Sequence, residues 1–371
     1  MKKALSLTLA LILVIGIALS GCGADGSAAT TAPTTGKDKA LAGKTISIMG
    51  DSISTYQGAS NGVAANTSNS TLRDNKKFYP RDTVKEVALN DTWWMQVIKD
   101  MGLRLLVNNS WSGSKLLKTS NGAVGAYIDR CVQLHDDTGA NAGETPDIIA
   151  ISLGTNDIAN KETLGTADIN YAKLIKDNGD GTYTYATPAT SLEAVAIILH
   201  KISIRYPDAE VYYLNLSHRI NGNDEIIGQF NIELKKVLDH FGTYLVDIYG
   251  SAITIEDFST YIGDNSVHPN KLGMDVYAEA FKRALVANTQ YEVNYHTVSF
   301  DLGAVTADYG DNMIVLDGET VTVKLQNTDG AKITITMGGK DVTDTVYSSG
   351  TIRLRNITAD VIIRAEAGAA P

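Results

Sequence analysis

Short runs of apolar, mostly β-branched residues alternate with stretches of helical period between residues 41 and 290. Five of these runs predict strands, and they lie at Thr45–Met49, Arg104–Asn108, Asp147–Leu153, Glu210–Leu216 and Tyr244–Ile248. Between them, apolar residues recur every three or four positions, which predicts helices. Strands that alternate with helices indicate a parallel sheet covered on both faces, and such sheets bind ligands at the carboxyl ends of their strands.

Several predicted helices carry boundary signals. Thr190 and Glu193 have the spacing of a capping box at the start of a helix with one apolar face. A second helix has its apolar positions between Ile227 and Phe241, and Gly242 is placed to end it. The last helix of this region begins after Pro269. These helices complete an α/β domain that we expect over residues 41–290.

After residue 290 the helical period gives way to alternation of apolar and polar residues across Gly and Asp turns. The alternating segments are Thr320–Leu325, Lys332–Met337, Thr351–Leu354 and Val361–Ala365. This pattern predicts a small, separate, all-β and sandwich-like module over residues 291–371. A further hairpin is predicted within the α/β domain, with its turn at Asp177–Gly181.

The N-terminal sequence has the order of a bacterial lipoprotein signal. Lys2 and Lys3 precede an apolar run that is too short to span a membrane but suits a secretory signal. The run ends in Leu19-Ser20-Gly21-Cys22, which resembles the lipobox, where cleavage leaves the cysteine lipid-modified. We expect a signal peptide at 1–21, a flexible tether at 22–40 rich in Gly, Ala, Ser and Thr, and an extracytoplasmic protein anchored to the bacterial cell membrane through Cys22.

Composition narrows the range of partners. The chain has 32 Lys and Arg against 42 Asp and Glu, a formal net charge of −10, and this balance offers no basic stripe for a phosphate backbone. Nucleic acid is therefore not an expected partner. Two cysteines exclude a disulfide-dense scaffold or a cysteine-built zinc site. With Cys22 lipidated, Cys131 is expected to be a buried thiol.

Four short motifs place reactive residues at the ends of predicted elements. The first strand runs into Gly50-Asp51-Ser52, the second is followed by a loop containing Gly113, and the third by Gly154-Thr155-Asn156-Asp157. His268 lies in a Pro/Asn loop that opens the last helix. Each motif alone also fits an ordinary turn or helix cap. Because the carboxyl ends of parallel strands meet at one edge, we expect these residues to converge.

In this order the motifs resemble those of the SGNH hydrolases, also called GDSL-type esterases, over roughly residues 44–286. The resemblance implies a flavodoxin-like three-layer α/β/α domain that hydrolyses esters without a cofactor or metal. It also implies that Ser52 is the nucleophile, that His268 is the general base, and that Gly113 and Asn156 form the oxyanion hole with the backbone N–H of Ser52. Such a serine needs an adjacent imidazole because its hydroxyl is a poor nucleophile at its ordinary pKa.

The sequence departs from the family pattern beside the histidine. The family usually carries an aspartate three residues before it, where this chain has Asn265, and Asp264 lies one residue earlier. Asp264 could orient the imidazole, Asn265 could do so through its amide oxygen, or no side chain does. Chemistry favours Asp264, because a carboxylate stabilises the imidazolium better than an amide, whereas register favours Asn265.

The setting suggests a substrate class. A lipid-tethered, extracellular enzyme with an appended β-module is expected to act on short acyl esters, in particular acetyl esters, of an external glycan. Two alternatives stay open: a lipase or lysophospholipase, which needs an apolar acyl groove, and a carbohydrate-binding lipoprotein with a decayed triad. Turnover of a short acyl ester separates enzyme from binder, and a chain-length series separates acetylesterase from lipase.

Overall fold

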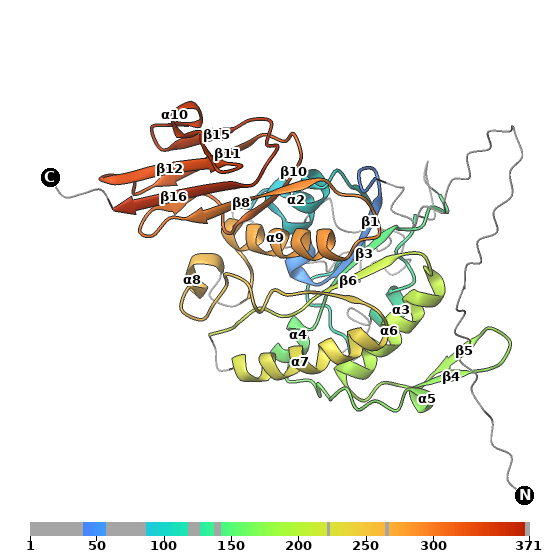
Figure 1. Cartoon of the computed structure of the whole chain (residues 1–371). Coiled ribbons are helices and arrows are strands. Elements are labelled where there is room, and N and C mark those ends of the chain that lie inside the picture. Colours follow the sequence, from blue (N-terminus) through green and yellow to red (C-terminus); the bar gives the residue numbers. More distant parts are fainter. Residues whose placement is uncertain are drawn as a thin grey trace, which may run out of the picture. The chain divides into compact units, whose positions relative to one another are not determined.

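A five-stranded parallel sheet organises the α/β part of the chain. The computed structural model describes residues 40–56, 87–117, 127–136, 142–220, 223–263 and 267–367. The strands of the sheet are β1 (Thr45–Gly50), β2 (Arg104–Asn108), β3 (Ile148–Ser152), β6 (Glu210–Leu214) and β7 (Tyr244–Val246). They pair in parallel in the order β2-β1-β3-β6-β7. Figure 1 labels the three central strands, β1, β3 and β6. The strand order is the flavodoxin-like one, so the predicted fold class is confirmed.

Helices cover both faces of this sheet. Successive strand residues point to opposite sides, so the buried strands have apolar side chains on both faces that need to be covered. The covering helices are α2 (Trp93–Asp100) and α9 (Lys271–Asn288) on one face, and α6 (Ser191–Arg205) and α7 (Asp224–His240) on the other. Ile46 and Ile48 of β1 belong to the core under α2 and α9, whereas Met49 belongs to the core under α6 and α7. All five residues of β3 are buried, as expected of a strand covered on both faces.

The predicted helix boundaries hold closely. Thr190 Oγ1 accepts a hydrogen bond from Glu193 N at 3.1 Å, and the Glu193 carboxylate accepts one from Thr190 N at 3.2 Å, which completes the capping box at α6. Helix α7 ends at His240, so Phe241 lies beyond it and is only half-buried, contrary to its predicted place on the apolar face. Gly242 follows with φ +64°, the left-handed conformation that glycine adopts most easily.

Shorter elements connect these layers. They are η1 (Ser52–Ser54), η3 (Leu89–Asp91), α3 (Tyr127–Arg130), α4 (Thr155–Ala159), α5 (Tyr171–Leu174), β4 (Ile175–Asp177), β5 (Tyr183–Tyr185) and α8 (Phe258–Tyr261). Strands β4 and β5 form the predicted hairpin, with Gly179 and Gly181 at positive φ in its turn. Cys131 is a free, buried thiol, as predicted, and burial raises its pKa to about 12.

The C-terminal part is β-rich, as predicted. Its elements are β8 (Tyr295–Asp301), β9 (Thr306–Ala307), β10 (Met313–Leu316), β11 (Val321–Gln326), β12 (Ala331–Met337), β13 (Lys340–Asp341), α10 (Thr343–Val346), β14 (Tyr347–Ser348), β15 (Thr351–Leu354) and β16 (Val361–Ala367). They form the sheets β10-β8-β16-β12-β13 and β14-β15-β11-β9, which share an apolar core. Strands β8 and β10 were not among the predicted segments, and β16 pairs with β8 in parallel.

Several predictions fall on residues outside the described ranges. These are the signal peptide at 1–21, the tether at 22–40 except its last residue Ala40, the lipidated Cys22, and Asp264 with its neighbour Asn265. The boundary between an α/β domain at 41–290 and a module at 291–371 stays a prediction. Across the residues that are described, no helix is both long enough and apolar enough to span a bilayer.

Candidate active site

Ser52 lies on a tight turn at the carboxyl end of β1. The strand ends at Gly50, and Asp51 caps the following 3-10 turn by accepting a hydrogen bond from Ile53 N at 3.0 Å. A Cβ at Gly50 would lie 2.6 Å from Ser54 Oγ, so only glycine lets the turn fold back on the strand this closely. Ser52 itself is 6% exposed. The turn therefore holds its hydroxyl at the sheet edge with little freedom to move.

His268 lies within hydrogen-bonding distance of this serine, although 216 residues separate the two along the chain. Its Nε2 is 2.8 Å from Ser52 Oγ. The backbone of the histidine is fixed by a hydrogen bond from Gly263 N to His268 O at 2.9 Å and by an isolated β-bridge between Ile262 and Pro269. An imidazole whose Nε2 carries no proton can take the proton of the serine hydroxyl at this distance.

Asn156 approaches the same turn from the end of β3. It lies in the first turn of α4, after Gly154, which has φ +114°. Its Nδ2 donates to Ser114 O at 2.9 Å and is 3.5 Å from Asp51 Oδ2. A carboxamide carries two N–H donors, so one can hold the Ser114 carbonyl while the other serves a ligand. The convergence of Ser52 and Asn156 at one sheet edge agrees with the sequence prediction.

Gly113 belongs to the turn that Asn156 holds. Ser114 N donates to Trp111 O at 3.1 Å and closes this turn, in which Gly113 is exposed and has φ +79°. Among the described residues, and apart from its two chain neighbours, no atom lies within 4 Å of a Cβ built on Gly113. Glycine is therefore needed here for its backbone conformation, while the space beside it is open to a substrate.

Two buried aspartates beside these residues were not predicted as part of the site. Asp51 and Asp157 are both 0% exposed, and burial raises the pKa of Asp51 to about 7 and that of Asp157 to about 6. Asp157 accepts hydrogen bonds from Leu116 N at 3.0 Å and Ser191 Oγ at 3.0 Å. They belong to the motifs Gly50-Asp51-Ser52 and Gly154-Thr155-Asn156-Asp157, but a sequence does not show that a carboxylate next to a reactive residue is buried.

Arg219 and Asn108 also support the site, and sequence reasoning missed both. Arg219, 9% exposed, donates from Nη2 to Thr155 O at 3.2 Å, and its charge opposes the upward shift in the pKa of Asp51. Asn108 donates from Nδ2 to Ser54 O at 3.0 Å and thereby ties the end of β2 to the serine turn. No local pattern marks these two contacts, since Thr155 lies 64 residues from Arg219 and Ser54 lies 54 residues from Asn108.

Asp264 and Asn265 both lie outside the described residues, so whether Asp264, Asn265 or no side chain orients His268 stays a prediction. In the described ranges, no group of three His, Cys, Asp or Glu side chains is arranged to hold a metal ion.

A serine paired with a histidine at the carboxyl edge of a parallel α/β sheet is the arrangement of hydrolases that act through an activated serine. The model of the GDSL-like lipase/acylhydrolase family matches residues 44–285, which include Ser52, Gly113, Asn156 and His268. The chain belongs to this family and is a carboxylic ester hydrolase.

The chain is also similar to several solved structures. One, described as a GDSL-like lipase from Bacteroides ovatus, is 25% identical with a TM-score of 0.48, and the match covers 67% of this chain and 100% of that one. A second, from Bacteroides uniformis, is 21% identical with a TM-score of 0.48, covering 66% and 97%. An acetyl xylan esterase from Geobacillus stearothermophilus is 15% identical with a TM-score of 0.39, covering 66% and 96%. No curated protein gives a significant match.

Proposed function

We propose that this protein is a serine esterase in which Ser52 is the nucleophile and His268 the general base. The observation that carries the proposal is the 2.8 Å separation between His268 Nε2 and Ser52 Oγ at the carboxyl edge of the sheet. Asn156 Nδ2 and the backbone N–H groups of Gly113 and Ser52 are the proposed oxyanion donors. Donors fixed before the reaction stabilise the charge that develops on the carbonyl oxygen, typically by about 3 kcal/mol each.

The proposed reaction has two steps, acylation of Ser52 and hydrolysis of the acyl-serine. Ser52 Oγ attacks the carbonyl carbon of the ester while His268 Nε2 takes the hydroxyl proton, and a tetrahedral oxyanion forms. The bond between that carbon and the alcohol oxygen then breaks, and the imidazolium returns the proton to the leaving alcohol. Water attacks the acyl-serine in the same way, with His268 again as base, and releases the carboxylic acid together with the original serine.

We propose Asp264 as the residue that orients His268. A carboxylate at the second ring nitrogen would both select the tautomer with an unprotonated Nε2 and stabilise the imidazolium during each half-reaction. Asn265, which occupies the family's usual register, is the competing candidate.

The proposed substrates are short acyl esters, in particular acetyl esters, of extracellular carbohydrate. The proposal rests on the lipoprotein signal, the predicted tether and the attached β-module, which together indicate an enzyme held at the outer side of a membrane through lipid on Cys22. Stable anchoring of this kind needs two hydrocarbon chains, which a diacylglyceryl-modified cysteine provides.

The test compares wild type with Ser52→Ala on 4-nitrophenyl acetate, butyrate and octanoate. Wild type should be fastest on acetate or butyrate, and Ser52→Ala should have lost turnover while its far-UV circular dichroism is unchanged. Ser203→Ala is the matched control, because Ser203 is an exposed serine on α6 whose Oγ donates to the local His200 O at 2.8 Å. A preference for octanoate would favour the lipase alternative.

If wild type does not exceed Ser52→Ala on any of these esters, the esterase proposal fails and a carbohydrate-binding role takes its place. If wild type does turn over these esters, a second assay identifies the acyl acceptor. It measures acetate release from acetylated xylan and from acetylated peptidoglycan, with acyl-lipid as the third substrate. Acid released from the lipid alone would contradict the carbohydrate assignment while leaving the catalytic one intact.

A further inference from the structure

Helix α9 determines where His268 lies. The histidine precedes the helix by three residues, and Asn270 caps its first turn by accepting a hydrogen bond from Gly273 N at 3.1 Å. The same Asn270 donates from Nδ2 to Thr260 O at 2.8 Å. A shift in the first turn of α9 therefore moves the imidazole relative to Ser52.

Two glycines let this first turn pack closely on both of its sides. A Cβ at Gly273 would lie 2.3 Å from Tyr261 O and 2.8 Å from the Cβ of Pro269, which adjoins the histidine. On the side of the β-rich part, a Cβ at Gly310 would lie 2.1 Å from Leu272 O. The loop at Gly310, the helix turn and the histidine loop are thus in continuous contact, so a displacement of the first is transmitted to the last.

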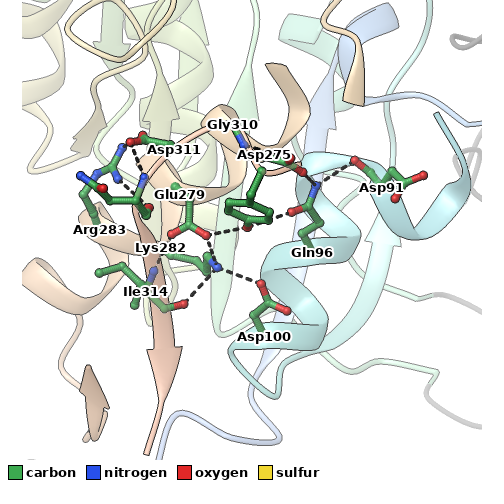
Figure 2. Close-up of polar contacts among 12 residues, drawn as sticks. Asp91, Gln96, Asp100, Asp275, Glu279, Lys282, Arg283, Gly310, Asp311 and Ile314 are labelled. Carbon is green, nitrogen blue, oxygen red and sulfur yellow. Dashed lines mark hydrogen bonds and ion pairs between the residues drawn. The ribbon is translucent and has the colours of Figure 1, made fainter. Parts of the chain in front are cut away.

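Three charged side chains of α9 are buried where the helix meets the β-rich part. Asp275, Glu279 and Lys282 are at most 1% exposed and share one helical face. Figure 2 shows Lys282 between the carboxylates of Glu279 and Asp100. Its Nζ is 2.5 Å from Glu279 Oε1 and 2.8 Å from Asp100 Oδ2. Burial raises the pKa of Asp275 to about 7, because its charged form is removed from water.

The β-rich part supplies partners for these buried groups. Gly310 N donates to Asp275 Oδ2 at 3.3 Å, and Tyr309 Oη donates to Glu279 Oε1 at 2.7 Å. Ile314 N donates to the other oxygen of Glu279 at 2.7 Å. An apolar contact could slide at little cost, whereas these directional bonds to buried charges are satisfied in only one register. Consistent with this, Lys37–Pro371 forms one compact unit.

We propose that the loop Tyr309–Gly310 and Asp275 are positioning residues for His268, so that the β-rich part belongs to the catalytic unit. The inference rests on the proposed function, in which His268 is the base. These residues act through α9 and do not touch the substrate. Because misplacing a catalytic group by about 1 Å costs on the order of 100-fold in rate, their loss lowers kcat and leaves KM unchanged.

The main test is Gly310→Ala in the full-length chain, with 4-nitrophenyl acetate as substrate. The added methyl must displace the loop or the helix turn, and we expect kcat to fall by roughly 10- to 100-fold at unchanged KM. The rate at which a fluorophosphonate labels Ser52 should fall in parallel, since it reports the serine–histidine geometry directly. Arg364→Ala is the control, because its exposed ion pair with Asp301 lies in the same β-rich part and should leave both rates unchanged.

A pair of variants at Asp275 separates positioning from stability. Asp275→Asn keeps an oxygen acceptor for Gly310 N and should retain most of kcat. Asp275→Leu has no such acceptor and should lose most of kcat. Both variants are measured well below their thermal unfolding midpoints. If Gly310→Ala does not fold, this pair decides alone.

If Gly310→Ala and Asp275→Leu keep the kcat and the labelling rate of the wild type and differ from it only by a lower unfolding midpoint, the positioning role is overturned. The esterase proposal is then unaffected. A wild type no faster than Ser52→Ala would instead refute the esterase, and with it the positioning role.

Discussion

Replacing Asn156 by alanine tests the oxyanion assignment most directly. The side chain reaches the serine turn from α4, and its Nδ2 donates to Ser114 O at 2.9 Å. Alanine removes this bond and the second N–H that we assign to the substrate oxygen. In the resting protein the variant thus loses the bond to Ser114 O and the longer, 3.5 Å bond to Asp51 Oδ2, and it also loses the bond that forms fully only in the transition state.

The losses in the resting protein and in the transition state differ in size and in the quantity that they change. The bond to Ser114 O is a neutral hydrogen bond, so its loss should reduce the free energy of unfolding by about 1 kcal/mol. Loss of an oxyanion donor should raise the activation barrier by about 3 kcal/mol, which corresponds to a decrease of 10²–10³ in kcat. Because the donor acts on the transition state, KM should change little.

Steady-state kinetics on 4-nitrophenyl acetate and urea unfolding measure these two effects separately. Asn288→Ala is the matched control: its exposed side chain likewise donates one hydrogen bond to a backbone carbonyl, Ala284 O at 2.7 Å, but at the far end of α9. It should leave kcat unchanged. A loss of less than about fivefold in kcat for Asn156→Ala, with normal stability, would refute the oxyanion role of this residue.

Three further outcomes are expected. Because burial raises the pKa of Asp51 from 3.8 to about 7, the folded protein keeps this proton longer than the unfolded chain, and the free energy of unfolding declines as pH rises through that window. In Asp51→Asn the difference in urea stability between about pH 5 and about pH 8 should shrink, and an undiminished difference would contradict the assignment. Asp264→Ala should lower kcat by orders of magnitude and Asn265→Ala only mildly. The reverse result means that an amide orients His268, and two mild effects mean a dyad. Mass spectrometry of the mature N-terminus should find a lipidated Cys22, and an unmodified terminus at any other residue would disprove the anchor.

Much of the fold could be predicted from local signals. The β-branched runs became the five strands of the parallel sheet, with ends that shifted by one or two residues, as at β3, where a predicted Asp147–Leu153 is Ile148–Ser152. The ends of a strand have the weakest local propensity, so their positions are predicted less accurately than the strand itself. The parallel pairing of β16 with β8 was not predictable in this way, because both strands alternate apolar and polar residues whichever partner they take.

For the site, the sequence by itself determined which residue types follow which strands. A serine after the first strand, a glycine after the second, an asparagine after the third and a histidine before the last helix must approach one edge once the strands are parallel, because their carboxyl ends lie together. That the serine and histidine lie within hydrogen-bonding distance, across 216 residues, depends on turns whose geometry a residue pattern does not specify.

Only the tertiary structure decided which charges are buried and what holds the histidine. In the sequence, nothing distinguishes Asp51 and Asp275 from the other forty acidic residues. In the folded protein, burial raises the pKa of each to about 7. Gly310 is an ordinary turn glycine in the sequence, yet it lies against the first turn of the helix that follows His268. The physical reason is that periodicity and capping act over a few residues, whereas desolvation and close packing depend on every segment that surrounds a group in space.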